Sequence, residues 1–261
     1  SLNINKGDFR WTTDFNISTN KTEVVKLLDG IDVLLDASPS YFSRADTHIL
    51  REGETPGAFY GYEYAGVYQG GALPEGTATF EGGVAGDPLF AEVADESGSV
   101  NGVIDTDDRK IIGDPTPNFT FGITNSFTYK NWDVNIFIQG SQGGEIFNMT
   151  NVQLFTGDGN TTYENFNNAW SASNTNSNIP RVGNNSPREF STRFIEDGSY
   201  IRLKNIAVGY NLPENVLEKL GAKNIRLSLS AQNLLTITEY SGLDPEVNYS
   251  AGEAGNNANN T

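Results

Sequence analysis

The acidic stretch 95–108 carries the clearest local chemistry in the sequence. Calcium-binding loops place oxygen ligands at alternate positions, a glycine at the sixth position and an acidic residue at the twelfth. With Gly102 at the sixth position, Asp108 falls at the twelfth. The predicted calcium ligands are Asp95, Ser97, Ser99, Asn101, the carbonyl of Val103, Asp105 and Asp108. Because serines make a weak start to such a site, an acidic loop that keeps its shape without metal is the alternative.

Aromatic side chains among many asparagines mark the long connection 142–198. Rings offer flat apolar faces, and amides both donate and accept hydrogen bonds, which suits stacking on sugars and bonding to hydroxyls. The candidate substrate-binding residues are Tyr163, Phe166 and Trp170, with Phe155 nearby. The alternative is that these rings pack the connection internally.

Catalysis has little support. The single histidine, His48, lies beside a predicted strand and is expected to be an ordinary surface or rim residue. Acidic pairs such as Asp107 and Asp108 are expected by chance in a chain with 33 acidic residues. The sequence has no phosphate-binding Gly-Lys-Ser/Thr loop and no nucleophile elbow. We therefore predict no enzyme activity and no organic cofactor.

The composition argues against several classes of binding partner and structural feature. A net charge of −16 argues against nucleic acid, because binding to phosphates needs a basic surface. The absence of cysteine excludes disulfides and thiolate metal sites within the chain. No apolar run approaches the roughly 18 residues of a transmembrane helix, although barrels spread their apolar residues over alternate positions.

Strict alternation of apolar and polar residues predicts long β-strands. In the segment 119–130 the odd positions are mostly apolar, and the even positions are polar or small. This period of two indicates a strand, and about 9–11 residues suffice to cross a bilayer at a tilt. The segment 131–141 repeats the pattern, so the two form a hairpin. Within 199–211 the apolar parity switches, which a β-bulge or a change of environment would explain.

The predicted strands alternate between short and long connections. About eight strands are expected, at 1–5, 8–20, 47–53, 57–68, 119–130, 131–141, 199–211 and 223–235. Short connections are expected at 6–7, 53–56, 130–131 and 212–222, and long ones at 21–46, 69–118 and 142–198. In an antiparallel barrel, all short turns then lie at the periplasmic rim and all long loops at the extracellular rim. Pro213 and Gly221 punctuate a small helix in one short turn.

The alternation also assigns a lipid face and a lumen face. The residues predicted to face lipid are Phe121, Ile123, Phe127, Trp132, Val134, Ile136, Leu227 and Leu229. The residues predicted to face the lumen are Thr124, Ser126, Asp133, Asn135, Ser228 and Gln232. A soluble β-rich binding or adhesin module is the alternative, but strands there usually have only about 5–6 residues. The pattern therefore favours an all-β, antiparallel transmembrane barrel segment.

Four phrases strengthen this interpretation: REGETPGAFYGYEYAGVYQ at 51–69, IIGDPTPNFTFG at 111–122, DGSYIRLKNIAVGYNLP at 197–213 and SAQNLLTITEYSGLDPE at 230–246. In this order and spacing, they resemble the C-terminal part of SusC/RagA-type TonB-linked outer-membrane proteins. The resemblance covers most of the chain.

The resemblance implies a barrel of about 22 strands with an N-terminal plug. It further implies a Gram-negative outer membrane, TonB and a SusD-like surface lipoprotein as partners, and import of glycans or peptides. Residues 1–261 would be the C-terminal part of the barrel, and the plug, the TonB-contacting segment and the last strand would lie outside the chain.

Overall fold

The computed structural model describes residues 2–36, 42–43, 46–156, 160–182 and 188–246. The chain divides into two compact units. The strand unit comprises Ser1–Asn20, Pro117–Gly144 and Gly198–Tyr240, and the loop unit comprises Lys21–Thr116, Glu145–Asp197 and Ser241–Thr261. No helix in the described part of the chain is long and apolar enough to cross a membrane.

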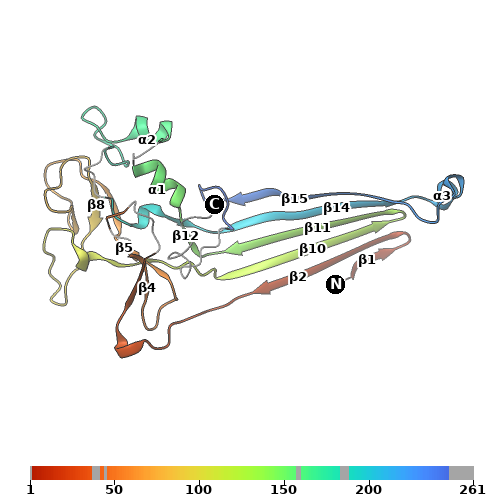
Figure 1. Ribbon diagram of the computed structural model, residues 1–261, viewed down its shortest axis with the longest axis horizontal. Coiled ribbons are helices and arrows are strands. Elements are labelled where there is room, and N and C mark those ends of the chain that lie inside the picture. The colour runs from red at the N-terminus through yellow and green to blue at the C-terminus, as the bar shows by residue number, and fades with distance from the viewer. Residues whose placement is uncertain (1, 37–41, 44–45, 157–159, 183–187, 247–261) are drawn as a thin grey trace. The chain divides into compact units, whose positions relative to one another are not determined.

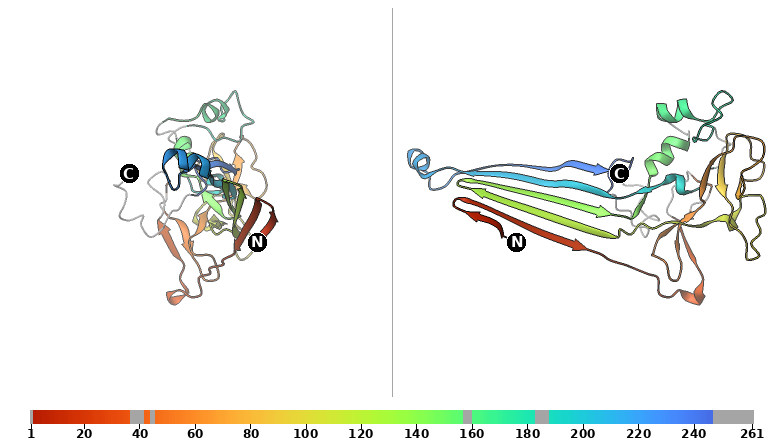
Figure 2. Two further views of the ribbon diagram at one scale, coloured as in Figure 1. Left: turned by 90° about the vertical axis from the view of Figure 1, so that its right-hand side faces the viewer. Right: turned by 180° about the vertical axis from the view of Figure 1, so that it is seen from behind.

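The strand unit is one antiparallel sheet of six strands in the order β1-β2-β10-β11-β14-β15 (Figures 1 and 2). The strands are β1 (Leu2–Lys6), β2 (Phe9–Ser18), β10 (Phe119–Tyr129), β11 (Trp132–Gln142), β14 (Tyr200–Asn211) and β15 (Arg226–Thr238). Each strand pairs with the next one in the sheet, so the three short connections share one end of it. Helix α3 (Glu214–Leu220) occupies one of them and ends at Gly221 with φ of 63°.

The register of the sheet separates apolar from polar residues. One row across five strands contains Trp11, Phe127, Val134, Val208 and Leu229. The adjacent row contains Thr12, Ser126, Asn135, Ala207 and Ser230. Since paired residues in a sheet share a face, one face is apolar and the other is mainly polar. The structure confirms that the residues predicted to face lipid share one face and that those predicted to face the lumen share the other.

A β-bulge explains the switch of parity within β14. The registers of β14 with β11 and with β15 both shift at Lys204, between Leu203 and Asn205. The extra residue returns Leu203 to the apolar face that Ile206 occupies. Asn233 in β15 lies close to this irregularity and has φ of 50°. Of the two explanations considered from the sequence, the bulge is confirmed.

Three small sheets form the framework of the loop unit. The first contains β3 (Val33–Asp36), β4 (Asp46–Leu50), β5 (Ala58–Gly61) and β9 (Lys110–Gly113). The second contains β6 (Tyr64–Val67), β8 (Pro88–Ala91) and β7 (Thr77–Ala78), and the third pairs β12 (Glu145–Phe147) with β13 (Ile195–Asp197). The helical elements are η1 (Leu28–Gly30), η2 (Thr106–Asp108), α1 (Met149–Thr156), α2 (Tyr163–Asn168) and η3 (Thr192–Phe194).

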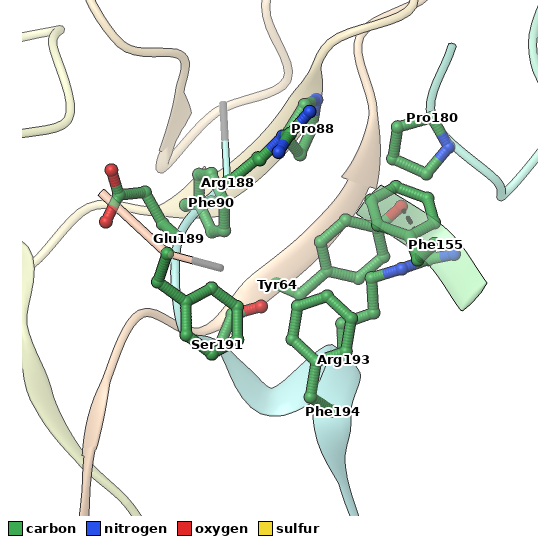
Figure 3. A pocket seen from close by; sticks show the side chains of 11 residues that line it. Tyr64, Pro88, Phe90, Phe155, Pro180, Arg188, Glu189, Ser191, Arg193 and Phe194 are labelled. Carbon is green, nitrogen blue, oxygen red and sulfur yellow. Dashed lines mark hydrogen bonds between the residues drawn. The ribbon is translucent and has the colours of Figure 1, made fainter. Parts of the chain in front are cut away.

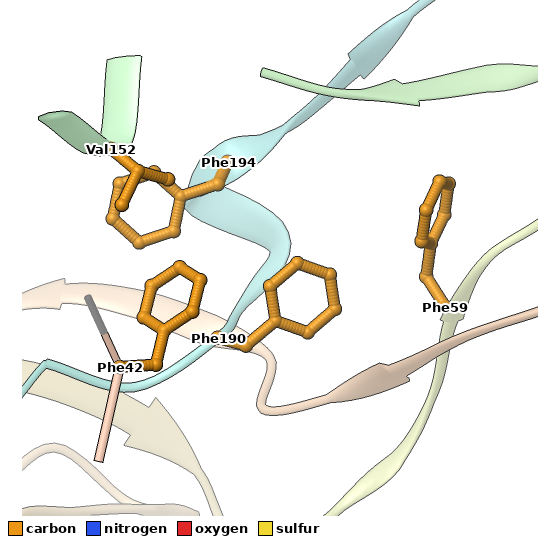
Figure 4. Packing of buried hydrophobic residues seen from close by; sticks show 5 residues of the cluster. All are labelled: Phe42, Phe59, Val152, Phe190 and Phe194. Atoms are coloured by element: carbon orange, nitrogen blue, oxygen red, sulfur yellow. The ribbon is translucent and has the colours of Figure 1, made fainter. Parts of the chain in front are cut away.

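Aromatic side chains build the cores of the loop unit. One cluster contains Phe42, Phe59, Val152, Phe190 and Phe194 (Figure 4). A second cluster contains Tyr62, Ala78, Phe90 and Ile104. Burying large rings is strongly favourable, since each removes about 150–250 Å² from water. The long connections are therefore a folded body with its own cores.

The prediction that two further segments are strands of the barrel is wrong. The segments 47–53 and 57–68 contribute β4, β5 and β6, which belong to sheets of the loop unit. Their strands have only four or five residues, and β4 and β5 are mostly buried along their whole length, unlike strands with one wet or lipid face. The connection 53–56 consequently lies inside the loop unit and is no turn of the barrel. Among the described residues, six strands form the barrel sheet, and not the expected eight.

Candidate functional site

On the polar face of the strand unit, side chains from different strands are joined by an ion pair and hydrogen bonds. Arg226 on β15 donates from Nη2 to a carboxylate oxygen of Asp133 on β11 at 2.7 Å. It does so across Gly209 on β14, where an added β-carbon would lie 2.3 Å from Arg226 Nη2. Asn135 donates to Ser126 Oγ at 2.9 Å on the same face. Such a polar face suits a barrel interior that is filled by water or by protein. Gly209 permits the ion pair, because a larger residue there would collide with Arg226.

Hydrogen bonds within the loop itself shape the first half of the stretch 95–108. The Asp95 carboxylate accepts from the Ser97 amide at 2.8 Å, from the Ser97 hydroxyl at 2.6 Å and from the Ser99 amide at 2.9 Å. The hydrogen bond from the Ser97 side chain, followed by that from the Ser99 backbone, lowers the pKa of the Asp95 carboxyl. Asp95, Ser97 and Ser99, three of the predicted calcium ligands, are thus hydrogen-bonded to one another.

The second half of the same stretch is a capped 3-10 turn. Asp105 accepts from the Asp107 amide at 2.8 Å, and Asp108 accepts from the Asp105 amide at 2.8 Å, which together form a capping box around η2. The other carboxylate oxygen of Asp108 accepts from the Val93 amide at 2.8 Å. Asp108 is only 5% exposed. Its carboxylate therefore holds the backbone of the turn.

The remaining predicted ligands follow the same pattern. Asn101 donates to Asp105 Oδ2 at 2.9 Å, and its own oxygen accepts from the Val103 amide at 2.9 Å. Among the residues that the structure describes, no three acidic or histidine side chains gather as a metal ion requires. Calcium binding by 95–108 stays a prediction.

Two of the four loop aromatics pack internally. Phe155 borders the first core cluster and lies 6.0 Å from the Phe194 ring. Trp170 donates from Nε1 to Gln69 Oε1 at 3.0 Å. A β-carbon added at Gly86 would lie 2.4 Å from the Trp170 ring, so this ring rests directly on a glycine backbone.

The other two aromatics point to solvent. Tyr163 and Phe166 lie one turn apart on α2, and they are 87% and 69% exposed. Thr162 caps the helix by accepting from the Asn165 amide at 3.0 Å. Of the predicted substrate-binding residues, this pair has its ring faces free.

His48 is buried, so the prediction of a surface or rim residue is wrong. The residue is 8% exposed, its ring lies 5.0 Å from the Phe59 ring, and its Nδ1 lies 2.9 Å from Thr47 Oγ1. Pairing of β4 with β5 brings these two rings together. Burial lowers the pKa of His48 to about 4. The residue is a neutral core side chain near neutral pH.

We expect acid to loosen the sheet around His48. Because its pKa is about 4 in the folded protein and 6.5 when exposed, the unfolded form binds the proton first as pH falls. Its contribution to stability is complete above pH 6.5 and falls by roughly 3 kcal/mol by pH 4. Amide hydrogen exchange of β4 and β5 in the intact receptor, corrected for intrinsic rates, measures this loss. The variant His48→Gln should lose the pH dependence, and an unchanged dependence would contradict the assignment.

A pocket that the sequence did not predict lies in the loop unit (Figure 3). Its lining comes from segments as distant as Phe42, Phe90 and Arg193. Local spacing carries no signal for such a site, because the residues meet only after the loop unit has folded.

The strand unit defines the class of protein. It is an antiparallel sheet with one apolar face, one polar face, strands of mostly ten residues or more, and short turns at one end. These are the features of a segment of a transmembrane β-barrel.

Comparison with known proteins gives the family. The chain is 53% identical over 250 residues to TonB-dependent receptor P3 of Formosa agariphila, covering 95% of this chain and 24% of that protein. It is 29% identical over 252 residues to TonB-dependent receptor SusC of Bacteroides thetaiotaomicron, covering 92% of this chain and 22% of that protein. The solved structure of the RagAB peptide transporter superposes with a TM-score of 0.73 at 25% identity, covering 94% of this chain and 25% of that chain. No protein-family model matches the chain.

The chain belongs to the TonB-dependent receptors and is of the SusC/RagA type. It spans about a quarter of the length of the relatives that it matches. The predicted family and the predicted fold class are confirmed.

Proposed function

We propose that the protein containing this chain imports nutrients across the outer membrane of a Gram-negative bacterium, with energy delivered through TonB. The observation that carries the proposal is the 53% identity to a TonB-dependent receptor over 95% of the chain. The two-faced six-stranded sheet supports it, because a barrel wall needs an apolar outside and a polar inside. In this proposal, the chain supplies part of the barrel wall and a folded extracellular loop unit.

The proposed cargo is an oligosaccharide or a peptide, handled together with a SusD-like surface lipoprotein. Similarity to SusC and to the RagAB peptide transporter supports this range of cargo and partner. Within the chain, the exposed rings of Tyr163 and Phe166 form the proposed contact surface. Trp170 has its indole nitrogen bonded to Gln69 and contributes by supporting the fold around it.

Growth measurements test the import function. A strain that lacks the receptor should lose growth on one member of a panel of oligosaccharides and peptides, and the intact gene should restore it. A strain without functional TonB should show the same loss. Growth of both strains on every member of the panel would remove the proposal.

The contact surface on α2 has a test of its own. The double variant Tyr163→Ala and Phe166→Ala should need roughly tenfold more substrate for half-maximal growth, since two stacked rings contribute about 1–3 kcal/mol. The matched control is Leu243→Ala, which trims an apolar side chain that is 95% exposed and lies outside α2. Equal growth curves for the double variant and the control would show that α2 does not contact the cargo.

Calcium binding is tested by calorimetry on the intact receptor. If calcium binds at 95–108, Asp105→Ala should abolish the heat of calcium binding. Asp107→Ala should leave that heat unchanged, because Asp107 is not a predicted ligand. Asp108→Ala is a poor probe, because it also removes the two backbone hydrogen bonds that hold the turn. A receptor that gives no calcium-dependent heat has no such site.

A further inference from the structure

Asn101 and Gly102 form the only asparagine–glycine pair in the sequence. An asparagine side chain can react with the backbone nitrogen of the next residue, and glycine hinders this reaction least because it carries no side chain. Both residues are exposed, and a β-carbon added at Gly102 would meet nothing within 4 Å. The reacting atoms therefore have room around them, and water reaches them.

Two hydrogen bonds restrain the Asn101 side chain. Its Oδ1 accepts from the Val103 amide at 2.9 Å, which makes an Asx turn. Its Nδ2 donates to Asp105 Oδ2 at 2.9 Å. The turn folds the side chain back over the peptide bond to Gly102 and directs its Cγ toward the Gly102 nitrogen. The Val103 N–H is also placed to stabilise negative charge that develops on Oδ1.

A carboxylate is bonded to the Gly102 nitrogen. The Gly102 amide donates to Glu92 Oε1 at 2.6 Å, and a general base must lie within hydrogen-bond reach of the proton that it removes. Glu92 follows β8 directly, and its own amide donates to the Gly76 carbonyl at 3.0 Å. Beyond Gly102, the amide of the buried Ile104 donates to the Thr79 carbonyl at 3.0 Å. The fold therefore anchors the base and the nucleophile on both sides of their contact.

We propose that Asn101 is a self-modification site, at which the side-chain amide is lost through a cyclic imide. The Gly102 nitrogen attacks Asn101 Cγ while Glu92 takes the proton of that nitrogen, so that an N–Cγ bond forms. The Cγ–Nδ2 bond then breaks, and the amide nitrogen leaves as ammonia with the proton that Glu92 removed. Water opens the resulting ring at either carbonyl carbon, which gives aspartate or isoaspartate at this position. The reaction consumes water, releases ammonia and changes no oxidation state.

Each product changes the stretch 95–108. Aspartate adds a negative charge at a predicted calcium ligand, beside Asp105. Isoaspartate lengthens the backbone before Gly102 by a methylene group, which removes the Asx turn and disturbs the path that leads Ile104 into its core cluster. The stretch is therefore altered progressively with time, whichever molecule the receptor imports.

Peptide mapping by mass spectrometry measures the conversion in the intact, detergent-purified receptor, incubated in water labelled with heavy oxygen. Asn101 should convert at least about tenfold faster in the folded receptor than in a free peptide of residues 95–108, because that peptide lacks the positioned base. Glu92→Gln should bring the rate in the receptor close to that of the peptide. The matched control is Glu96→Gln, which removes the same charge from an exposed position of the same stretch and should leave the rate unchanged.

Three results would overturn the proposal. They are an unmodified Asn101 in the wild-type receptor, conversion no faster than in the free peptide, and equal rates for Glu92→Gln and Glu96→Gln. Unchanged amide hydrogen exchange of β8 would show that Glu92→Gln keeps its fold. If that variant unfolds, the comparison of the wild-type receptor with the free peptide still decides, because it involves no substitution.

Discussion

Arginine in place of Ile136 is expected to destabilise the barrel by about 2–4 kcal/mol, whereas arginine in place of Asn135 should cost far less. The two residues are neighbours near the middle of β11 and lie at similar depth in the sheet. Ile136 pairs with Ile206 on the apolar face, and Asn135 pairs with Ser126 and Ala207 on the polar face. Only at Ile136 must the guanidinium leave water for hydrocarbon.

Equilibrium unfolding of the whole receptor in lipid vesicles measures this difference. Since both variants carry the same new side chain in the same strand, changes in strand propensity and net charge cancel between them. Equal destabilisation by the two substitutions would contradict the lipid and lumen assignment of the sheet.

The two faces of the sheet were predictable because strand geometry itself imposes them. Successive side chains point to opposite faces, so each residue of β10 or β11 is assigned by its parity alone. The bulge at Lys204 was visible for the same reason, since one inserted residue reverses the parity. The short turn at Pro213 and Gly221 was likewise determined by local backbone preferences.

Sheet membership was not predictable, because alternation does not say which strands pair. The residues of β4 and β5 have the apolar character of a barrel strand, but they pair within the loop unit. Their burial follows from contacts with residues far away in the sequence, such as Phe190 with Phe59. The same limit applies to His48, whose buried position follows from its place opposite Phe59.

In the candidate sites too, local sequence predicted some features, while others depend on contacts with distant residues. The stretch 95–108 was recognisable from the types and spacing of its residues. The capping role of Asp108 was not, because it depends on a hydrogen bond from Val93 and on the conformation of the turn. The exposure of Tyr163 and the packing of Trp170 against Gly86 cannot be told apart from the sequence, because both are aromatic residues in a polar connection. The pocket of Figure 3 forms only when segments as distant as Phe42, Phe90 and Arg193 come together.

The ion pair between Arg109 and Asp46 should be the most sensitive polar contact of the loop unit. Arg109 is 7% exposed and pairs with the Asp46 carboxylate. Its Nη2 also donates to the carbonyl oxygens of Asp46 at 2.6 Å and Tyr60 at 3.0 Å, and its guanidinium centre lies 4.6 Å from the Tyr60 ring centroid. One side chain therefore ties β4 to β5 at the start of β9.

Arg109→Met is expected to destabilise the sheet of β4, β5 and β9 by about 3–5 kcal/mol, because it leaves a largely buried carboxylate without a partner. The control is Arg51→Met, which removes the other cation over the same Tyr60 ring, 5.6 Å from its centroid. Arg51 pairs with Asp32, but their side chains are 38% and 39% exposed, so the loss should be at most about 1 kcal/mol.

Amide hydrogen exchange in the intact receptor is the suitable measurement, since it reports the stability of the loop unit separately from that of the barrel. Adding Asp46→Leu to Arg109→Met should recover most of the loss, because an apolar pair of similar volume needs no counter-charge. A double variant that is less stable than Arg109→Met alone would show that the cost came from lost packing over Tyr60, and not from the stranded charge. Equal effects of Arg109→Met and Arg51→Met would lead to the same conclusion.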